Sequence, residues 1–204
     1  MTTIILVRHG HVEWIAPERF RGRAELPLSD LGRRQAQAVA RYIAATWKPD
    51  AVYTSPLGRC RDTGAAIAAP FQLEAQPIAG LADIDYGEWQ GLTRGEAKER
   101  WPDETELWFR APHLAALPGG ETLAAVLSRA SAALRDILRR HPTGTVVLVG
   151  HDSVNRVLLL FALELPLSRY WHLRQEPCAV NELFFEDGSF VIRSINGTQH
   201  LAGL

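Results

Sequence analysis

The sequence predicts an α/β fold of three layers, in which helices cover both faces of a mainly parallel sheet. Strand-like and helix-like segments alternate along the 204 residues, which is the pattern of parallel strands joined by helical crossovers. The runs 3–8 and 145–149 are apolar and rich in β-branched residues, as expected of strands buried on both faces. A chain of this length is expected to form one domain over residues 1–204.

The first half of the chain contains five expected elements. They are strand 3–8, a helix from Ser29 to about Thr46, strand 51–54, helix 57–68 and a short strand at 77–79. Ser29 is expected to cap its helix, because a serine hydroxyl can accept hydrogen bonds from the free N–H groups of a first turn.

The second half supplies the rest of the sheet. Apolar residues recur at helical spacing from Leu123 to Leu138, which predicts an amphipathic helix. Strand 145–149 follows, and the apolar run 154–163 predicts a buried helix. Segments 179–185 and 189–195, joined at Asp187-Gly188, are typical of a closing hairpin.

The region 92–120 interrupts this alternation and is expected to be a helical insertion that covers the strand ends. It contains Trp101 and Trp108 together with three prolines. Two interpretations stay open at this point. The tryptophans pack the insertion onto the body, or some of them line a substrate pocket together with Trp14 and Trp89.

Composition excludes several classes of partner. The formal net charge is -1, so the protein has no overall field that would attract nucleic acid or an anionic membrane. No apolar stretch reaches the ~20 residues of a membrane span, and no signal peptide is visible. Two cysteines are too few for a disulfide framework, which favours a reducing, cytoplasmic location.

Polar residues follow two of the predicted strands at their carboxyl ends. Arg8-His9-Gly10 follows the first, and Gly150-His151-Asp152-Ser153 follows the strand at 145–149. Ligands of open α/β sheets bind where strands end in this way. Arg8 could hold an anion with its planar guanidinium, His9 could act as a nucleophile, and Gly10 could let the backbone approach a ligand.

Two further segments carry candidate site residues. Arg59 lies on the first turn of helix 57–68, where free N–H groups favour anions. Cys60 beside it is either a reactive thiol with a lowered pKa or a small packed side chain. The loop 81–91 contributes two aspartates, Asp83 and Asp85. The other histidines are scattered and predict no metal site.

Taken in order along nearly the whole chain, these motifs resemble the histidine phosphatase superfamily, also called the phosphoglycerate mutase-like family. The resemblance is greatest to the small bacterial phosphatases of branch 1. The matching segments are Arg8-His9-Gly10, Arg21-Gly22, Ser55-Pro56-Leu57 with Arg59 and Thr63, Gly87-Glu88-Trp89-Gln90-Gly91, Pro118-Gly119-Gly120-Glu121 and Gly150-His151.

The resemblance implies a phosphomonoesterase that acts on a small phosphorylated metabolite without a metal ion or other cofactor. His9 would form a phosphohistidine, and Arg8, Arg59 and His151 would hold the phosphoryl oxygens. Asp83 stands where the family usually has a glutamate and is the expected general acid; Asp152 is the rival. The expected substrate-binding residues are Gly10, Arg21, Gly22, Tyr86, Asp152 and Ser153.

Two other functions remain as alternatives. A cofactor-dependent phosphoglycerate mutase would need extra cations around a closed pocket, and relatives of that kind have a longer insertion with paired arginines. This chain also has Ile15 where mutases usually place an asparagine. A non-catalytic phosphate-binding module would not require the intact set of Arg8, His9, Arg59 and His151.

Overall fold

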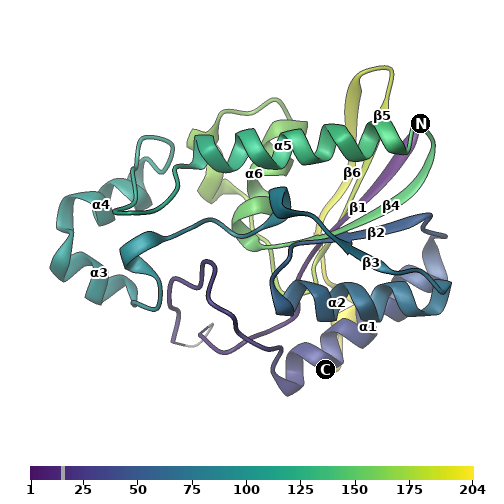
Figure 1. The fold of residues 1–204 in the computed structure, drawn as a ribbon, viewed down its shortest axis with the longest axis horizontal. Coiled ribbons are helices and arrows are strands. Elements are labelled where there is room, and N and C mark those ends of the chain that lie inside the picture. Colours follow the sequence, from purple (N-terminus) through teal and green to yellow (C-terminus); the bar gives the residue numbers. More distant parts are fainter. Residues whose placement is uncertain (15–16) are drawn as a thin grey trace.

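The protein is built on one six-stranded sheet with helices on both faces, which confirms the predicted α/β class (Figure 1). The computed structural model describes residues 1–14 and 17–204, so Ile15 lies outside the described residues. The strand order is β3-β2-β4-β1-β5-β6. The strands are β1 (Thr2–Arg8), β2 (Ala51–Thr54), β3 (Ala75–Pro77), β4 (Gly144–Gly150), β5 (Val180–Glu186) and β6 (Ser189–Gly197).

Strands β3, β2, β4 and β1 are parallel, whereas β5 and β6 add an antiparallel edge, so the sheet is mixed. In the central pair, Arg8 of β1 lies opposite Gly150 of β4. Thr54 of β2 lies opposite Val149. This register brings the residues that follow all three strands to the same edge of the sheet.

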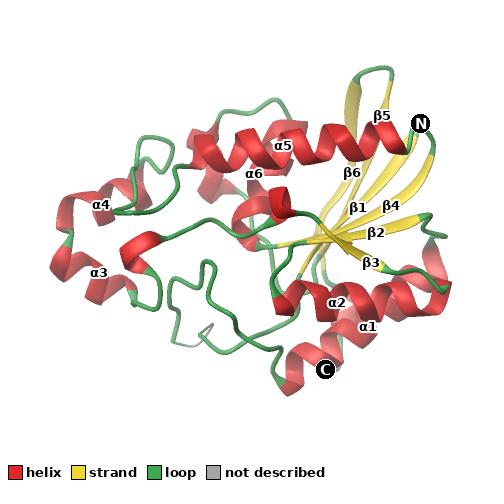
Figure 2. Ribbon diagram, in the orientation of Figure 1, coloured by secondary structure: helices red, strands yellow, loops and turns green. Residues whose placement is uncertain are grey.

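The helices cover the two faces in pairs (Figure 2). Helices α1 (Asp30–Thr46) and α2 (Gly58–Ala68) pack on one face, and α5 (Leu123–Arg140) and α6 (Asp152–Ala162) pack on the other. Side chains alternate along β1 accordingly. Ile4 and Leu6 belong to the core under α5 and α6, whereas Ile5 and Val7 belong to the core under α1 and α2.

The predicted start of the Ser29 helix and the hairpin are confirmed, whereas the third strand is misplaced by two residues and α6 begins at Asp152, two residues before the predicted 154. Ser29 accepts a hydrogen bond from Gly32 N–H at 3.1 Å and caps α1. The hairpin turns at Asp187-Gly188, where both residues have positive φ. Strand β3 ends at Pro77, and residues 79–81 form a 3₁₀ turn, because the chain leaves the sheet edge toward the loop that carries Asp83.

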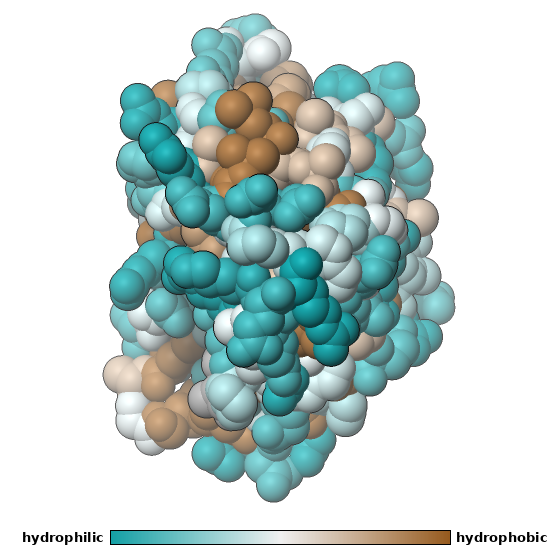
Figure 3. Space-filling view, turned by 90° about the vertical axis from the view of Figure 1, so that its left-hand side faces the viewer, coloured by the Kyte–Doolittle hydropathy of each residue, from teal (hydrophilic) through white to brown (hydrophobic). Residues whose placement is uncertain are grey.

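The insertion predicted at 92–120 is present as helices α3 (Arg94–Arg100) and α4 (Pro102–Arg110), at the left of Figure 1. Thr93 and Glu96 form a capping box at the start of α3. Figure 3 looks onto this end of the molecule, whose surface is mostly hydrophilic, with an apolar patch near the top and another at the lower left. Among the described helices, none combines the length and apolarity needed to cross a bilayer.

Candidate active site

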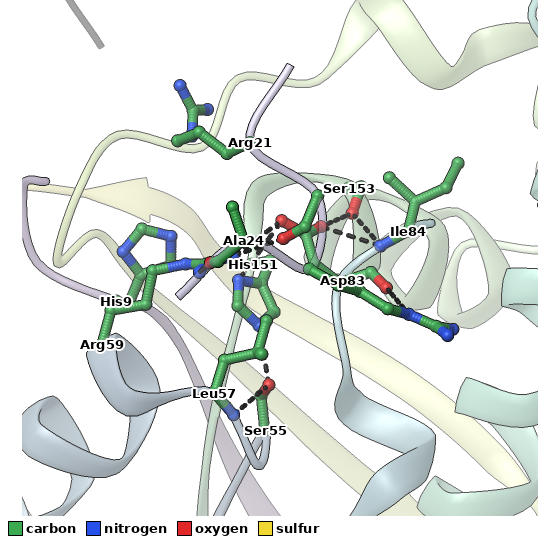
Figure 4. Close-up of polar contacts among 12 residues, drawn as sticks. His9, Arg21, Ala24, Ser55, Leu57, Arg59, Asp83, Ile84, His151 and Ser153 are labelled. Carbon is green, nitrogen blue, oxygen red and sulfur yellow. Dashed lines mark hydrogen bonds and ion pairs between the residues drawn. The ribbon is translucent and has the colours of Figure 1, made fainter. Parts of the chain in front are cut away.

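The residues after β1 and β4, together with the loop around Asp83, surround a cavity of about 180 Å³. Six of the residues expected from the sequence line it: His9, Arg21, Asp83, Tyr86, Asp152 and Ser153. The expected clamp residues Arg59 and His151 are buried beside them (Figure 4), and the third, Arg8, is buried as well. The structure therefore brings the two strand-end motifs, the helix start and the acidic loop together.

His9 is oriented by its own backbone neighbour. Its Nδ1 lies 2.7 Å from the carbonyl oxygen of Gly10. Because a carbonyl oxygen can only accept, Nδ1 carries the proton and Nε2 keeps its lone pair. Burial lowers the pKa of His9 well below its ordinary 6.5, and the nearby His151, Arg59 and Arg8 lower it further. At neutral pH the side chain is an uncharged imidazole with a free nitrogen.

His151 stands beside His9, with the ring centroids 5.1 Å apart. Its Nε2 is 2.7 Å from Ser55 Oγ, and its Nδ1 is 3.4 Å from Asp83 Oδ2. Burial, followed by the charges of Arg59 and Arg8, lowers the pKa of His151 well below 6.5. A neutral His151 can accept from the Ser55 hydroxyl and direct its Nδ1 proton toward the site.

Arg59, on the first turn of α2, is fully buried and organises the loop that enters the site. Its Nη1 donates to the carbonyl of Ala24, and its Nη2 donates to the carbonyl of Gly22, each at 2.7 Å. The same Nη2 lies 3.2 Å from Asp83 Oδ2. Arg59 thus connects the loop after β1 to the acidic loop.

Arg8 and Arg59 share an unusual feature: the Nε–H of each guanidinium is buried and has no hydrogen-bond partner in the described part of the chain. Arg8 uses its Nη1 to donate to the carbonyl of Gln175 and lies 3.9 Å from Asp152. A buried donor without a partner costs about 1–3 kcal/mol. An anion that accepts from these groups would remove this cost, which favours anion binding next to His9.

Asp83 makes contact with both sides of the site. Its Oδ2 faces Arg59 and His151, while its Oδ1 accepts from Ile84 N–H at 2.9 Å and from the hydroxyl of Ser153. Asp152 is bound differently, since both of its contacts of 3.1 Å are to Arg156, one turn along α6. Of the two rival carboxylates, Asp83 is the one in direct contact with His151.

The loop that carries Asp83 is held by a brace that sequence reasoning missed. Arg129 of α5 donates to the carbonyls of Gly80, Ala82 and Asp83 at 2.6–3.0 Å, and its guanidinium forms a bidentate pair with Glu121. Glu121 also accepts from Asp85 N–H at 3.0 Å. Glu121 belongs to a matching motif, but its partner is eight residues away on the next helix and has no motif of its own.

Gly10 and Gly22, which were expected to bind the substrate, each have a structural role in the fold. A Cβ atom at Gly10 would lie 2.6 Å from the carbonyl oxygen of Gly32, so the glycine is required by the close approach of α1. Gly22 has a φ of +48° and offers its carbonyl to Arg59. That either glycine contacts the substrate stays a prediction. Arg21 lines the cavity but stands apart from the hydrogen-bonded cluster in Figure 4.

Cys60 packs against the ring of His151, 3.4 Å from its Nε2. Burial raises the pKa of this thiol, and the opposing effect of Arg59 is smaller. Of the two alternatives for Cys60, the packed side chain is therefore the one observed, because the desolvation outweighs the neighbouring charge. Cys60 is a packed side chain that supports His151.

The outer walls of the cavity differ from the expected tryptophan pocket. Trp108 lines the cavity and is also fully buried, so both interpretations of the insertion hold for this residue. Trp89 is buried in the core, and Trp14 lies outside the lining. The remaining wall residues were not anticipated: Glu18, Arg19, Phe20, Arg94, Phe109, Arg156 and Trp171.

Within residues 1–14 and 17–204, His, Cys, Asp and Glu side chains form no group of three or more that could hold a metal ion. The groups that converge on the cavity are instead guanidinium groups, neutral imidazoles and the carboxylates of Asp83 and Asp152. This arrangement can bind a phosphoryl group and present a nitrogen nucleophile to it.

The two buried histidines should make stability depend on pH. In the unfolded chain their pKa is near 6.5, whereas in the folded protein it is lower, so the unfolded state binds more protons as pH falls. We expect the free energy of unfolding to decrease below about pH 6.5, with the two side chains together contributing up to roughly 2.7 kcal/mol per pH unit. Denaturant titrations from pH 7.5 to 5 measure this slope.

A His9→Gln variant serves as the control for this dependence. Removing one of the two titrating groups should make the slope between pH 6.5 and 5 shallower. An unchanged slope would contradict the assignment of His9 as neutral in the folded protein.

The comparisons with known proteins agree with this geometry. Residues 4–198 match the sequence profile of the histidine phosphatase superfamily (branch 1). The chain is 32% identical over 201 residues to phosphoserine phosphatase 1 of Hydrogenobacter thermophilus, covering 98% of this chain and 95% of that protein. It is 30% identical over 206 residues to a metal-independent phosphoserine phosphatase of Arabidopsis thaliana, covering 100% and 85%.

Among solved structures, Bacillus stearothermophilus YhfR matches with a TM-score of 0.93 at 28% identity, covering 98% of this chain and 100% of that one.

Proposed function

Because the chain belongs to branch 1 of the histidine phosphatase superfamily, we propose that it hydrolyses small phosphomonoesters through a phosphohistidine on His9, without a metal ion. The chain is a phosphoric monoester hydrolase that acts on a small phosphorylated metabolite. The two relatives from Hydrogenobacter thermophilus and Arabidopsis thaliana are named phosphoserine phosphatases, which favours hydrolysis over the mutase alternative. Phosphorylated small acids are therefore the first substrates to test.

The observation that carries the proposal is the orientation of His9. Its proton is fixed on Nδ1 by the Gly10 carbonyl, so that Nε2 is left as the nucleophile. Burial keeps the imidazole neutral at physiological pH. A binding module would have no need of a neutral, oriented imidazole among arginines.

In the first step, Nε2 of His9 attacks phosphorus, and the bond from phosphorus to the leaving oxygen breaks. Arg8, Arg59 and the Nδ1–H of His151 stabilise the negative charge on the other phosphoryl oxygens. Asp83, in its protonated form, gives its proton to the leaving oxygen, so that the alcohol departs neutral. Its contacts with Arg59 and His151 support this role, because they place it beside the clamp.

In the second step, water attacks the phosphohistidine and loses a proton to the carboxylate of Asp83. The nitrogen–phosphorus bond breaks, which releases inorganic phosphate and restores neutral His9. Ser153 holds one oxygen of Asp83 and Arg59 the other, so the carboxyl group stays in place between the two steps. Arg21, Tyr86 and Asp152 line the space left for the substrate.

Hydrolysis of p-nitrophenyl phosphate in EDTA tests the proposed function directly. Turnover should persist in the chelator and should be inhibited by orthophosphate or vanadate, which compete for the phosphoryl site. If activity disappeared in EDTA and returned with a divalent ion, the metal-free mechanism would be wrong. If no phosphomonoester were hydrolysed under any condition, the chain would be a binding module instead.

Replacing Arg59 with lysine should be damaging although the charge is kept. Lysine lacks the planar fork that reaches the carbonyls of Gly22 and Ala24 together, and it cannot present the same donors to a phosphoryl group. We expect kcat/KM to fall by about 10²-fold, the usual loss for one well-placed donor. Arg61→Lys, an exposed position on the same helix, is the control. Near-normal kcat/KM in Arg59→Lys would refute the clamp.

Two other expectations stay predictions of this proposal. One domain over residues 1–204 is supported by the single sheet on which the site is built. A cytoplasmic location is supported by Cys60 and Cys178, which are both unpaired and buried.

A further inference from the structure

One wall of the cavity is a stack of four planar groups, two aromatic rings between two guanidinium groups. The guanidinium of Arg94 lies over the ring of Phe109 at 3.9 Å. Phe109 stacks on Trp171 with centroids 5.5 Å apart and planes 17° from parallel. The guanidinium carbon of Arg156 lies 5.0 Å from the centroid of the Trp171 ring. These four residues, all of which line the cavity, join α3, α4, the turn at 167–172 and α6.

The stack is fixed at its inner end. Arg156 is held by Asp152, whose helix begins directly after His151. Trp171 donates its indole N–H to the carbonyl of Trp108 at 2.9 Å. The support of Arg94 therefore starts beside His151 and is rigid. The guanidinium of Arg94 is oriented before any ligand arrives.

Arg94 differs from the other arginines of the cavity in having its donors uncommitted. Arg19 pairs with Glu96 and donates to the carbonyl of Gly91, and Arg156 pairs with Asp152. Arg21 donates to the carbonyl of Trp14. Arg94 makes no hydrogen bond or ion pair with any described residue; its contact is the face of Phe109.

We propose that Arg94, supported by the Phe109–Trp171 stack, binds a carboxylate on the leaving group of the substrate. The proposal rests on the proposed function and narrows its substrate class to phosphomonoesters that carry a carboxylate. A single guanidinium matches a carboxylate in charge and in planar, bidentate geometry. The faces of Phe109 and Trp171 are covered within the stack, so the apolar edges of these rings would contact the body of the leaving group between the two anionic ends.

The test compares matched substrates with and without the carboxylate. The pairs are 3-phosphoglycerate with glycerol 3-phosphate, and 4-carboxyphenyl phosphate with phenyl phosphate. The two carboxylate substrates differ in the distance between their phosphate and their carboxylate. In the wild type, kcat/KM should favour the carboxylate in at least one pair. In Arg94→Gln that preference should fall by about tenfold or more, the usual effect of losing a charged hydrogen bond. The kcat/KM for the substrate without the carboxylate should change by less than about twofold.

The control is Arg110→Gln. Arg110 lies in the same insertion, is 81% exposed in its side chain and pairs with Glu106 outside the cavity, so its loss should change neither substrate. Arg94→Lys should keep part of the preference, because the charge remains without the stacked fork. Equal losses for both members of each pair, or no loss, would overturn the proposal. The proposed function fails separately, if wild type hydrolyses none of the four compounds.

Discussion

An alanine at position 9 is expected to reduce turnover on the order of 10⁴-fold or more, the largest effect of any single change in this protein. The reason is specific to the nucleophile. His9 Nε2 is the atom that would bond to phosphorus, because Nδ1 is hydrogen-bonded to the Gly10 carbonyl. Among the described residues that line the cavity, no other is a histidine. In the variant, Arg8 and Arg59 can still bind phosphate, but neither can form the covalent bond to phosphorus.

The loss should be one of chemistry and not of folding. His9→Ala should unfold cooperatively and should still bind orthophosphate, which calorimetry and denaturant titration would show. His113→Ala, an exposed position in the loop after α4, is the matched control and should keep full activity. Residual turnover within tenfold of the wild type would show that His9 is not the nucleophile.

Asparagine at position 83 is expected to separate substrates by their leaving groups. An alkoxide needs a proton as it departs, whereas p-nitrophenolate leaves largely unaided. Asp83→Asn should therefore lose about 10²–10⁴-fold in kcat/KM on an alkyl phosphate, the usual contribution of general acid catalysis, and far less on p-nitrophenyl phosphate. The amide keeps the size of the carboxyl group and its hydrogen bond from Ile84.

Asp152→Asn is the matched comparison, since Asp152 lines the same cavity but is bound to Arg156. It should show no such selectivity. If the selectivity appeared in Asp152→Asn instead, the acid would be Asp152. Equal and modest losses in both variants would mean that neither carboxylate protonates the leaving group.

The centre of the site could be predicted from the sequence because it follows from strand ends. Two buried runs that each end in a histidine must bring those histidines together if the strands are parallel neighbours, and the pairing of Arg8 with Gly150 does so. The motif around Arg59 adds a helix start at the same edge, beside the end of β2. These relationships depend on local sequence and on sheet geometry alone.

The walls and supports could not be predicted because they depend on contacts between distant segments. Arg129 holds the Asp83 loop from a helix 46 residues further along the chain. Trp171 meets Phe109 only after the insertion folds back over the strand ends. The two alternatives for Cys60 could not be separated for a similar reason, since the sequence shows its charged neighbour but not the burial that outweighs it.

The most direct test of the central claim is to locate the covalent phosphate. The wild type is mixed with a phosphomonoester labelled in its phosphoryl group, quenched within milliseconds in alkali, and digested for mapping by mass spectrometry. We expect acid-labile, alkali-stable phosphate on the peptide that contains His9, and none in His9→Ala. Phosphate on any other residue of the active protein would contradict the mechanism proposed for this site.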